Sequence, residues 1–164
     1  MTKDDLSDIY RGYIACLNKQ DWSHLGQFVH EEVHYNGERI GLSGYRKMLE
    51  GDFLSIPDLY FNIQMLISEP PRVASRLSFD CTPKGILFGL PVNGKRVSFV
   101  ENVFYEFRNE QIEKVWSVID KSRYRISASV RKLLLFFEPS VKCPARVCSP
   151  ANFFAHTFWN QKKS

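Results

Sequence analysis

The chain has 164 residues, of which 44% are hydrophobic, 14% aromatic and 24% charged. This length and hydrophobic share predict one globular domain with a substantial core. No stretch approaches the ~18 consecutive apolar residues of a membrane-spanning helix, so we expect no membrane span. The first residues are acidic where a signal peptide would be basic and then apolar, and we therefore expect a cytoplasmic location.

The formal net charge of +4 is unevenly distributed along the chain. Residues 1–120 hold 13 basic and 17 acidic residues, whereas residues 121–164 hold 9 and 1. We expect a domain over residues 1–121 and an atypical basic tail over residues 122–164, partly helical or disordered. Because the domain is mildly acidic, nucleic acid is not an expected partner of the fold. The tail is interpreted either as a basic amphipathic arm or, preferably, as sequence read after a frameshift.

Hydrophobic spacing predicts three helices in the first part of the chain. Apolar residues three and four apart predict a helix over residues 6–17, with a capping signal at Thr2. A second helix is predicted after Asp21 and a third from Ser43. Between them, Asn36-Gly37 predicts a turn.

From residue 60 the hydrophobic period becomes two, which is typical of strands. Strands are predicted over residues 60–67, 73–81, 97–107 and 112–119. In the first of them, one covered face is expected to hold Phe61, Ile63, Met65 and Ile67. Asn93-Gly94 predicts a hairpin turn. Helices followed by such strands indicate an α+β fold, a cone-shaped curved antiparallel sheet packed against N-terminal helices, whose concave side forms a small-molecule pocket.

Two carboxylates interrupt apolar rows on the predicted strands. Asp120 shares a strand face with Trp116 and Val118, and Glu101 interrupts the apolar face of the strand over residues 97–107. A desolvated carboxyl has a raised pKa and can act as a general acid/base near neutral pH, so both residues are catalytic candidates. The alternatives are that Asp120 ends its strand in solvent and that Glu101 lies at a bulge where the alternation resets.

Five further side chains are candidates for substrate binding, whereas the cysteines do not form a metal site. The substrate-binding candidates are Trp116, Tyr13, His34, Asn102 and Tyr105, of which the aromatic ones also fit a role in the core. The four cysteines lack the spacing of a disulfide scaffold or a zinc site, and no phosphate-binding loop occurs. We therefore expect neither a metal nor a cofactor.

Five runs stand in order along residues 1–121: Gly41-Leu42-Ser43-Gly44-Tyr45-Arg46, Ile56-Pro57-Asp58-Leu59, Cys81-Thr82-Pro83-Lys84-Gly85, residues 88–95, and residues 112–120. Together they resemble the SnoaL-like polyketide cyclases, also called ester cyclases. The most specific run has the form Ile-x-x-x-Trp-x-x-x-Asp. The resemblance implies the cone-shaped α+β barrel of the nuclear transport factor 2-like superfamily.

The resemblance also implies an activity without a metal or cofactor. In this family the aspartate that closes the Trp-x-x-x-Asp motif, here Asp120, is the general acid/base of an intramolecular aldol condensation of a small poly-carbonyl substrate. Two alternatives stay open: a non-catalytic small-molecule binding module, and an isomerase or epoxide hydrolase on the same scaffold. The chain departs from the family in its basic tail and in the link over residues 108–111, which lacks the usual glycine.

We further expect a homodimer, because the convex face of such a sheet often remains apolar enough to need a partner. Val100 and Phe104, or the alternate residues if the strand parity is reversed, are the expected contacts.

Overall fold

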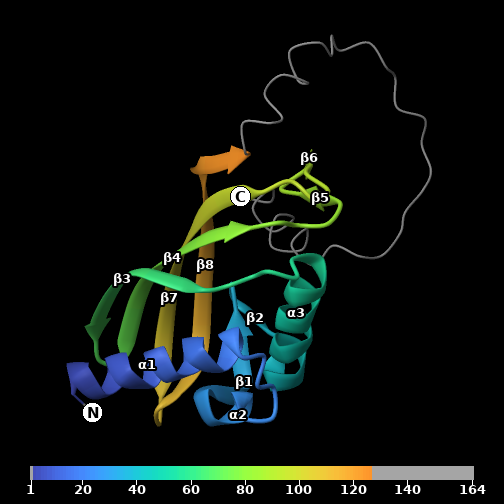
Figure 1. Ribbon diagram of the computed structural model, residues 1–164. Helices are drawn as coiled ribbons and strands as arrows, with labels where there is room; N and C mark the ends of the chain where they lie inside the picture. Colours follow the sequence, from blue (N-terminus) through green and yellow to red (C-terminus); the bar gives the residue numbers. More distant parts are fainter. Residues whose placement is uncertain (1, 127–164) are drawn as a thin grey trace, which may run out of the picture.

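The computed structural model describes residues 2–126 (Figure 1). Three helices and the first two strands come first: α1 (Lys3–Asn18), α2 (Leu25–Phe28), β1 (Val29–Tyr35), β2 (Glu38–Arg39) and α3 (Gly41–Ser55). Six strands follow: β3 (Asn62–Glu69), β4 (Arg72–Cys81), β5 (Ile86–Leu87), β6 (Leu90–Pro91), β7 (Val97–Arg108) and β8 (Gln111–Ile126). The expectation of a partly helical or disordered tail over residues 122–164 falls mostly on residues outside the described range.

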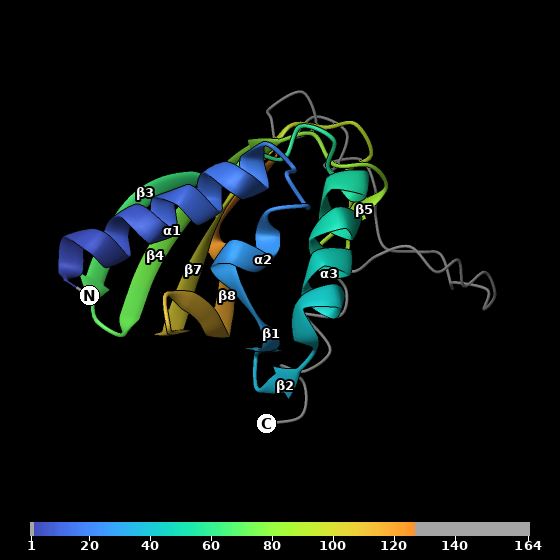
Figure 2. The same ribbon diagram turned by 90° about the horizontal axis from the view of Figure 1, so that it is seen from below.

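Helix α1 begins with the capping box that the sequence predicts. The Thr2 hydroxyl accepts the Asp5 N–H at 3.2 Å, and the Asp5 carboxylate accepts the Thr2 N–H at 2.8 Å. The helix lies across the sheet and packs on β3 and β4, with Leu6, Tyr10 and Tyr13 buried against the strands (Figure 2). This packing fixes the position of the Tyr13 side chain.

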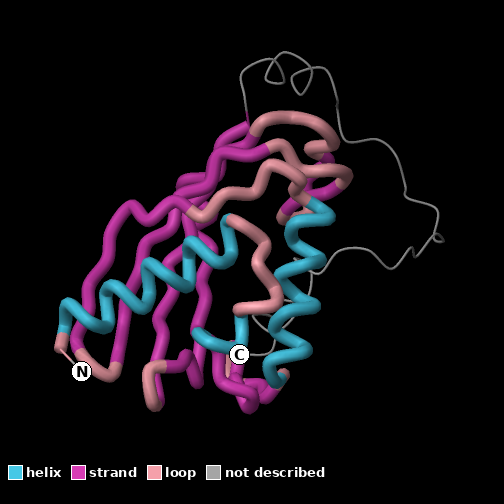
Figure 3. Tube along the Cα trace, turned by 60° about the horizontal axis from the view of Figure 1, so that its bottom comes forward, coloured by secondary structure: helices cyan, strands magenta, loops and turns pink. Residues whose placement is uncertain are grey.

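The large sheet has the strand order β2-β1-β8-β7-β4-β3. Neighbouring strands are antiparallel except for the parallel pair β1 and β8, so the sheet is mixed. It is strongly curved, and the helices lie along its concave side (Figure 3). The α+β fold with N-terminal helices on a curved sheet is confirmed.

The turns follow the sequence in two places and depart from it in a third. Asn36-Gly37 joins β1 and β2 with φ of 48° and 88°, as predicted. The short hairpin of β5 and β6 instead turns at Phe88-Gly89, with φ of 52° and 80°. Asn93-Gly94 does form a tight turn, closed by the Lys95 N–H donating to the Val92 carbonyl at 2.6 Å, but it lies between β6 and β7, which are not paired, so it is not a hairpin turn. The link at residues 109–110 turns without glycine.

Two elements differ from their predicted extent or face. Helix α2 has only four residues, because Val29 already begins β1. In β3 the register against β4 shifts between Ile63 and Met65. The shift reverses the alternation, so Met65 and Ile67 are 55% and 59% exposed, whereas Leu66 turns inward. The prediction of one covered apolar face is wrong beyond Ile63.

The core lies between the concave face of the sheet and the helices. At one end four aromatic rings follow one another, with centroids 6.1 Å apart for Phe53 and Phe61, 5.4 Å for Phe61 and Phe79, and 4.7 Å for Phe79 and Phe99. At the other end the rings are tyrosines, among them Tyr105. No helix within residues 2–126 is long and apolar enough to cross a membrane.

Candidate functional site

Strands β7 and β8 divide their side chains between a buried inner face and an exposed outer face. On the inner face Val103, Tyr105 and Val115 are at most 4% exposed. On the outer face Phe104 is 51% exposed and Trp116 is 39% exposed. Within residues 2–126 the helices pack on the inner face, and a pocket forms between them and the sheet.

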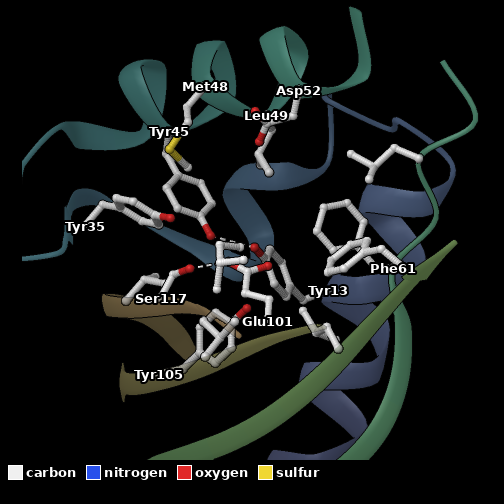
Figure 4. Close-up of a pocket in the computed structure, with 16 residues that line it drawn as sticks. Tyr13, Tyr35, Tyr45, Met48, Leu49, Asp52, Phe61, Glu101, Tyr105 and Ser117 are labelled. Carbon is white, nitrogen blue, oxygen red and sulfur yellow. Dashed lines mark hydrogen bonds between the residues drawn. The ribbon is translucent and has the colours of Figure 1, made fainter. Parts of the chain in front are cut away.

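A pocket of about 50 Å³ lies between this inner face and helices α1 and α3 (Figure 4). Its walls are mostly apolar, and its polar groups belong to Tyr13, Tyr35, Tyr45, Asp52, Glu101, Tyr105 and Ser117. Sites for drug-sized ligands enclose roughly 300–1,000 Å³. An occupant larger than a few atoms must therefore move the side chains that close the pocket or extend through its opening.

Glu101 projects from β7 into this pocket. The Ser117 hydroxyl on β8 donates a short hydrogen bond to its carboxylate. The Ser117 N–H is itself held by the Asn36 side-chain oxygen at 2.9 Å, which fixes this part of β8. Burial raises the pKa of Glu101, and the Ser117 hydrogen bond opposes that rise. The result is a carboxyl that holds a proton more readily than a carboxyl in water does.

Asp52 is the second carboxyl of the pocket. Helix α3 carries it on the same side as Tyr45 and Leu49, seven and three residues earlier, which also line the cavity. Burial raises the pKa of Asp52, and the negative charge of Glu101 raises it further. Within residues 2–126 no group of three His, Cys, Asp or Glu side chains is placed to hold a metal ion.

The tyrosines supply neutral hydrogen-bond donors. The hydroxyl oxygens of Tyr13 and Tyr45 lie 2.6 Å apart, which joins α1 to α3 across the pocket. Tyr105 packs edge-on against Tyr13 with ring centroids 6.0 Å apart. Burial raises the pKa of all three phenols above the ordinary value, so they stay protonated. Protonated phenols in an apolar pocket can donate to a carbonyl or enolate oxygen.

The structure brings together three of the residues named from sequence: Glu101, Tyr13 and Tyr105. The expectation that Glu101 interrupts a buried apolar face is confirmed, because Phe99 and Val103 on either side of it are 1% and 3% exposed.

Asp120, Trp116 and Asn102 lie on the outer face. Arg76 of β4 donates to the Asn102 oxygen at 2.8 Å and to the Asp120 carboxylate at 3.2 Å. Asp120 therefore neighbours a guanidinium and the exposed Val118, rather than the buried apolar row that we expected. The alternation in the sequence did not show which face of β8 is the inner one, because over residues 115–120 each row contains two apolar residues and one polar residue.

His34 is also outside the pocket. It pairs with Lys114 of β8, and its neighbour Tyr35 takes the pocket-facing position. The His34 Nδ1 atom is buried and has no hydrogen-bond partner among the described residues.

Four polar pocket residues were not predicted as site residues from the sequence: Tyr35, Tyr45, Asp52 and Ser117. The spacing of residues in the sequence could have identified two of them, Tyr45 and Asp52. Tyr45, Leu49 and Asp52 stand four and three residues apart, so they share one face of the predicted third helix. A carboxylate on the apolar face of a helix is as unusual as one on the apolar face of a strand.

Comparisons with known proteins agree with the fold. The family model described as SnoaL-like polyketide cyclase matches residues 7–125. A SnoaL-like polyketide cyclase of Agrobacterium tumefaciens has 50% sequence identity and a TM-score of 0.72, with 81% of this chain and 99% of that chain covered. No match was found among curated proteins.

More distant solved structures share the fold. TsrD from Streptomyces laurentii is 19% identical with a TM-score of 0.66, covering 81% of this chain and 97% of its own. AclR from Streptomyces galilaeus is 20% identical with a TM-score of 0.62, covering 82% and 99%. Because the family model matches well over half of the chain and the Agrobacterium relative is half identical, this chain belongs to the SnoaL-like polyketide cyclase family.

Proposed function

We propose that the protein is a cofactor-independent cyclase that closes a ring in a small poly-carbonyl substrate by an intramolecular aldol-type condensation, with Glu101 as the general base. The observation that carries the proposal is a carboxyl of raised pKa inside a mostly apolar pocket with phenolic donors. The substrate class is taken from the family and from the name of the Agrobacterium relative.

The first chemical step needs a base and a partner for the negative charge. Glu101 removes a proton from a carbon flanked by two carbonyl groups, and the electron pair of the broken C–H bond moves onto an oxygen as an enolate. The hydroxyls of Tyr13 and Tyr45 are the donors for that oxygen. A donor already in place stabilises the charge more than water does, because it does not have to reorganise.

The second step forms the ring. The enolate carbon attacks a ketone of the same molecule, and the new alkoxide takes up a proton. The two proton transfers balance, so the product is an isomer of the substrate. Once side chains have moved to admit the substrate, the pocket would hold both ends of one chain in contact, and such proximity supplies a large part of the rate.

Asp120 is the rival base, because the family resemblance assigns it this role. Two observations favour Glu101. The Arg76 guanidinium beside Asp120 stabilises the ionised carboxylate and so makes it a weaker base, whereas the Ser117 hydroxyl that donates to Glu101 is neutral. Glu101 also lines the pocket between the sheet and the helices, whereas Asp120 does not.

The test is deuterium uptake, followed by NMR, at the acidic carbon of β-keto esters and short polyketone mimics in heavy water. We expect acceleration by the native protein and a loss of about 10²–10⁴-fold in Glu101→Gln. Asp120→Asn is the matched control and should retain the activity within about threefold. The reverse pattern, with activity lost only in Asp120→Asn, would make Asp120 the base.

The same panel separates the alternatives. Tight ligand binding with no exchange by the folded native protein would indicate a binding module instead. Exchange without a cyclised product, on substrates able to cyclise, would indicate an isomerase. Opening of an epoxide mimic alone would indicate a hydrolase.

The homodimer expected from the sequence also belongs to this proposal, with the outer face as the contact. Its exposed apolar side chains are Met65, Ile67, Phe104, Trp116 and Val118. The charges that flank them are paired within the same face: Arg76 with Asp120, and Glu106 with both Arg72 and Lys114. A second copy could thus cover the apolar surface while each of these charged side chains keeps its partner. Sedimentation of only monomer at about 50 μM, a typical range for weak dimers, would contradict it.

A further inference from the structure

We propose that Asp52 is the second proton-transfer residue of this pocket and, in its neutral form, delivers the proton to the new alkoxide while Glu101 acts as the base. The inference rests on the proposed function and divides its two proton transfers between two side chains.

The first argument is the placement of the two carboxyls. Glu101 enters the pocket from the sheet, and Asp52 enters from α3 on the opposite wall (Figure 4). Phenol rings, among them Tyr45, fill the space around them. An aldol reaction develops its enolate and its alkoxide at different ends of the reacting segment. Groups on opposite walls can serve two such ends at once, which one carboxyl cannot do without moving.

The second argument is the difference between their hydrogen bonds. Glu101 accepts the Ser117 hydroxyl, which stabilises its ionised form. Among the described residues no side-chain donor reaches the Asp52 carboxyl, so it lacks the hydrogen bond that stabilises the ionised form of Glu101. Two carboxylates in one apolar cavity resist ionising together, and the pair therefore shares a proton. The hydrogen bond decides that this proton lies on Asp52.

The groups facing the pair are consistent with this state. From the surrounding elements they are Tyr13 of α1, Tyr35 of β1, Tyr45 of α3, Tyr105 of β7 and Ser117 of β8. None of these groups is a cation that would hold Asp52 ionised. Burial and the charge of Glu101 both raise the pKa of Asp52, in the direction that the proposal needs.

The proton balance closes without a co-reactant. Glu101 gains the proton from carbon as the C–H bond breaks, and Asp52 loses its proton as the alkoxide O–H bond forms. After product release Glu101 is neutral and Asp52 is ionised. Transfer of one proton from Glu101 to Asp52, through water admitted by the open pocket, restores the starting state.

The experiment measures two quantities on the full chain: deuterium exchange at the acidic carbon and formation of cyclised product from the same polyketone mimic. Asp52→Asn keeps the shape of the side chain but cannot donate an acidic proton. We expect its exchange rate to stay within about threefold of the native rate and its cyclisation rate to fall about 10²-fold. Glu101→Gln should lose both. Glu50→Gln, on the same helix and paired with Arg46 at 2.8 Å, should lose neither.

The pH dependence of the cyclisation rate distinguishes proton transfer by Asp52 from a purely structural role, because a structural role would not change the shape of the pH profile. Native cyclisation should fall at high pH as Asp52 ionises, and that limb should disappear in Asp52→Asn. Asp52→Glu should recover part of the cyclisation rate.

The outcomes separate the two proposals. Equal loss of exchange and cyclisation in Asp52→Asn, or no loss of either, overturns the role of Asp52 while the base function of Glu101 stands. Absence of exchange by the native protein overturns the proposed function itself. Circular dichroism of each variant verifies that the comparison is made between folded proteins.

Discussion

Glu101 and Asp120 lie on neighbouring strands but on opposite faces of the same sheet. Glu101 stands opposite Ile119 in the ladder and faces the tyrosine-lined pocket, whereas Asp120 stands opposite Val100 and faces Arg76. A cation beside a carboxylate stabilises its charge, and apolar walls with a neutral hydroxyl do so far less. The two faces therefore give two carboxyl groups different acid–base properties.

The aromatic residues of β7 show the same division. Phe99 on the inner face is 1% exposed and stacks on Phe79, whereas Phe104 on the outer face is 51% exposed. The inner face thus carries the packing that stabilises the fold, and the outer face carries surface that remains available for contact with a partner.

The largest expected effect of this difference is on stability. Phe99→Ala should lower the free energy of unfolding by about 3–5 kcal/mol, because it leaves a cavity beside Phe79 and Phe88. Phe104→Ala should lower it by less than about 1 kcal/mol, because half of the ring is already in solvent. Urea denaturation, at protein concentrations too low for association, measures the free energy of unfolding of both variants. Equal losses would contradict the assignment of inner and outer faces.

The second effect concerns the pocket donors. Tyr45→Phe removes one hydroxyl of the 2.6 Å pair with Tyr13, and we expect cyclisation to slow about 10²-fold, or ~2.7 kcal/mol in the barrier. Tyr60→Phe, at a side chain that is 62% exposed, is the control and should change nothing measurable. Steady-state product formation gives the comparison. Unchanged turnover in Tyr45→Phe would remove the Tyr13 and Tyr45 pair from the mechanism.

The third effect is a pH dependence of stability. Folding raises the pKa of both Asp52 and Glu101. As the pH rises, these carboxyls therefore ionise in the unfolded chain before they ionise in the folded one. The stability they contribute is fully present below the pKa values of the unfolded chain, near 4, and is lost as the pH rises through the pKa values of the folded chain. Asp52→Asn and Glu101→Gln should each raise the Tm at pH 8 relative to native protein, by about 2–4 °C for every kcal/mol recovered.

At pH 3 the same variants should gain nothing, because both carboxyls are protonated in the folded and the unfolded chain. Thermal unfolding at the two pH values tests this. A gain that is equal at pH 3 and pH 8 would mean that the effect is packing rather than ionisation.

Much of the fold follows from patterns in the sequence. The helix over residues 3–18 with its cap, the turn at Asn36-Gly37 and the strands before and after residues 109–110 are all predictable from spacing and turn residues. The parallel contact of β1 with β8 is not predictable in this way, because it joins segments about 80 residues apart in sequence and depends on the closure of the whole sheet.

The candidate site was only partly predictable, for a related reason. Alternation shows which residues share a face but not which of two faces is the inner one. On β7 the choice was clear, because the row around Glu101 is strongly apolar. On β8 both rows are mixed, and in β3 a bulge exchanged them, so Asp120 and Met65 were assigned the wrong surroundings.

The smallest expected effect is that of Asp120→Asn on stability. The variant loses the 3.2 Å contact with Arg76, but Arg76 still donates to Asn102 at 2.8 Å and to Gln64 at 3.0 Å. The guanidinium therefore keeps two partners, and a partly exposed ion pair contributes at most about 1 kcal/mol. Urea denaturation at low and high salt should show a loss of that size at low salt and a smaller one at high salt, because ions screen the pair. A loss of several kcal/mol that is insensitive to salt would mean that the outer face is sealed from water by a second copy, since only then is the ion pair fully desolvated.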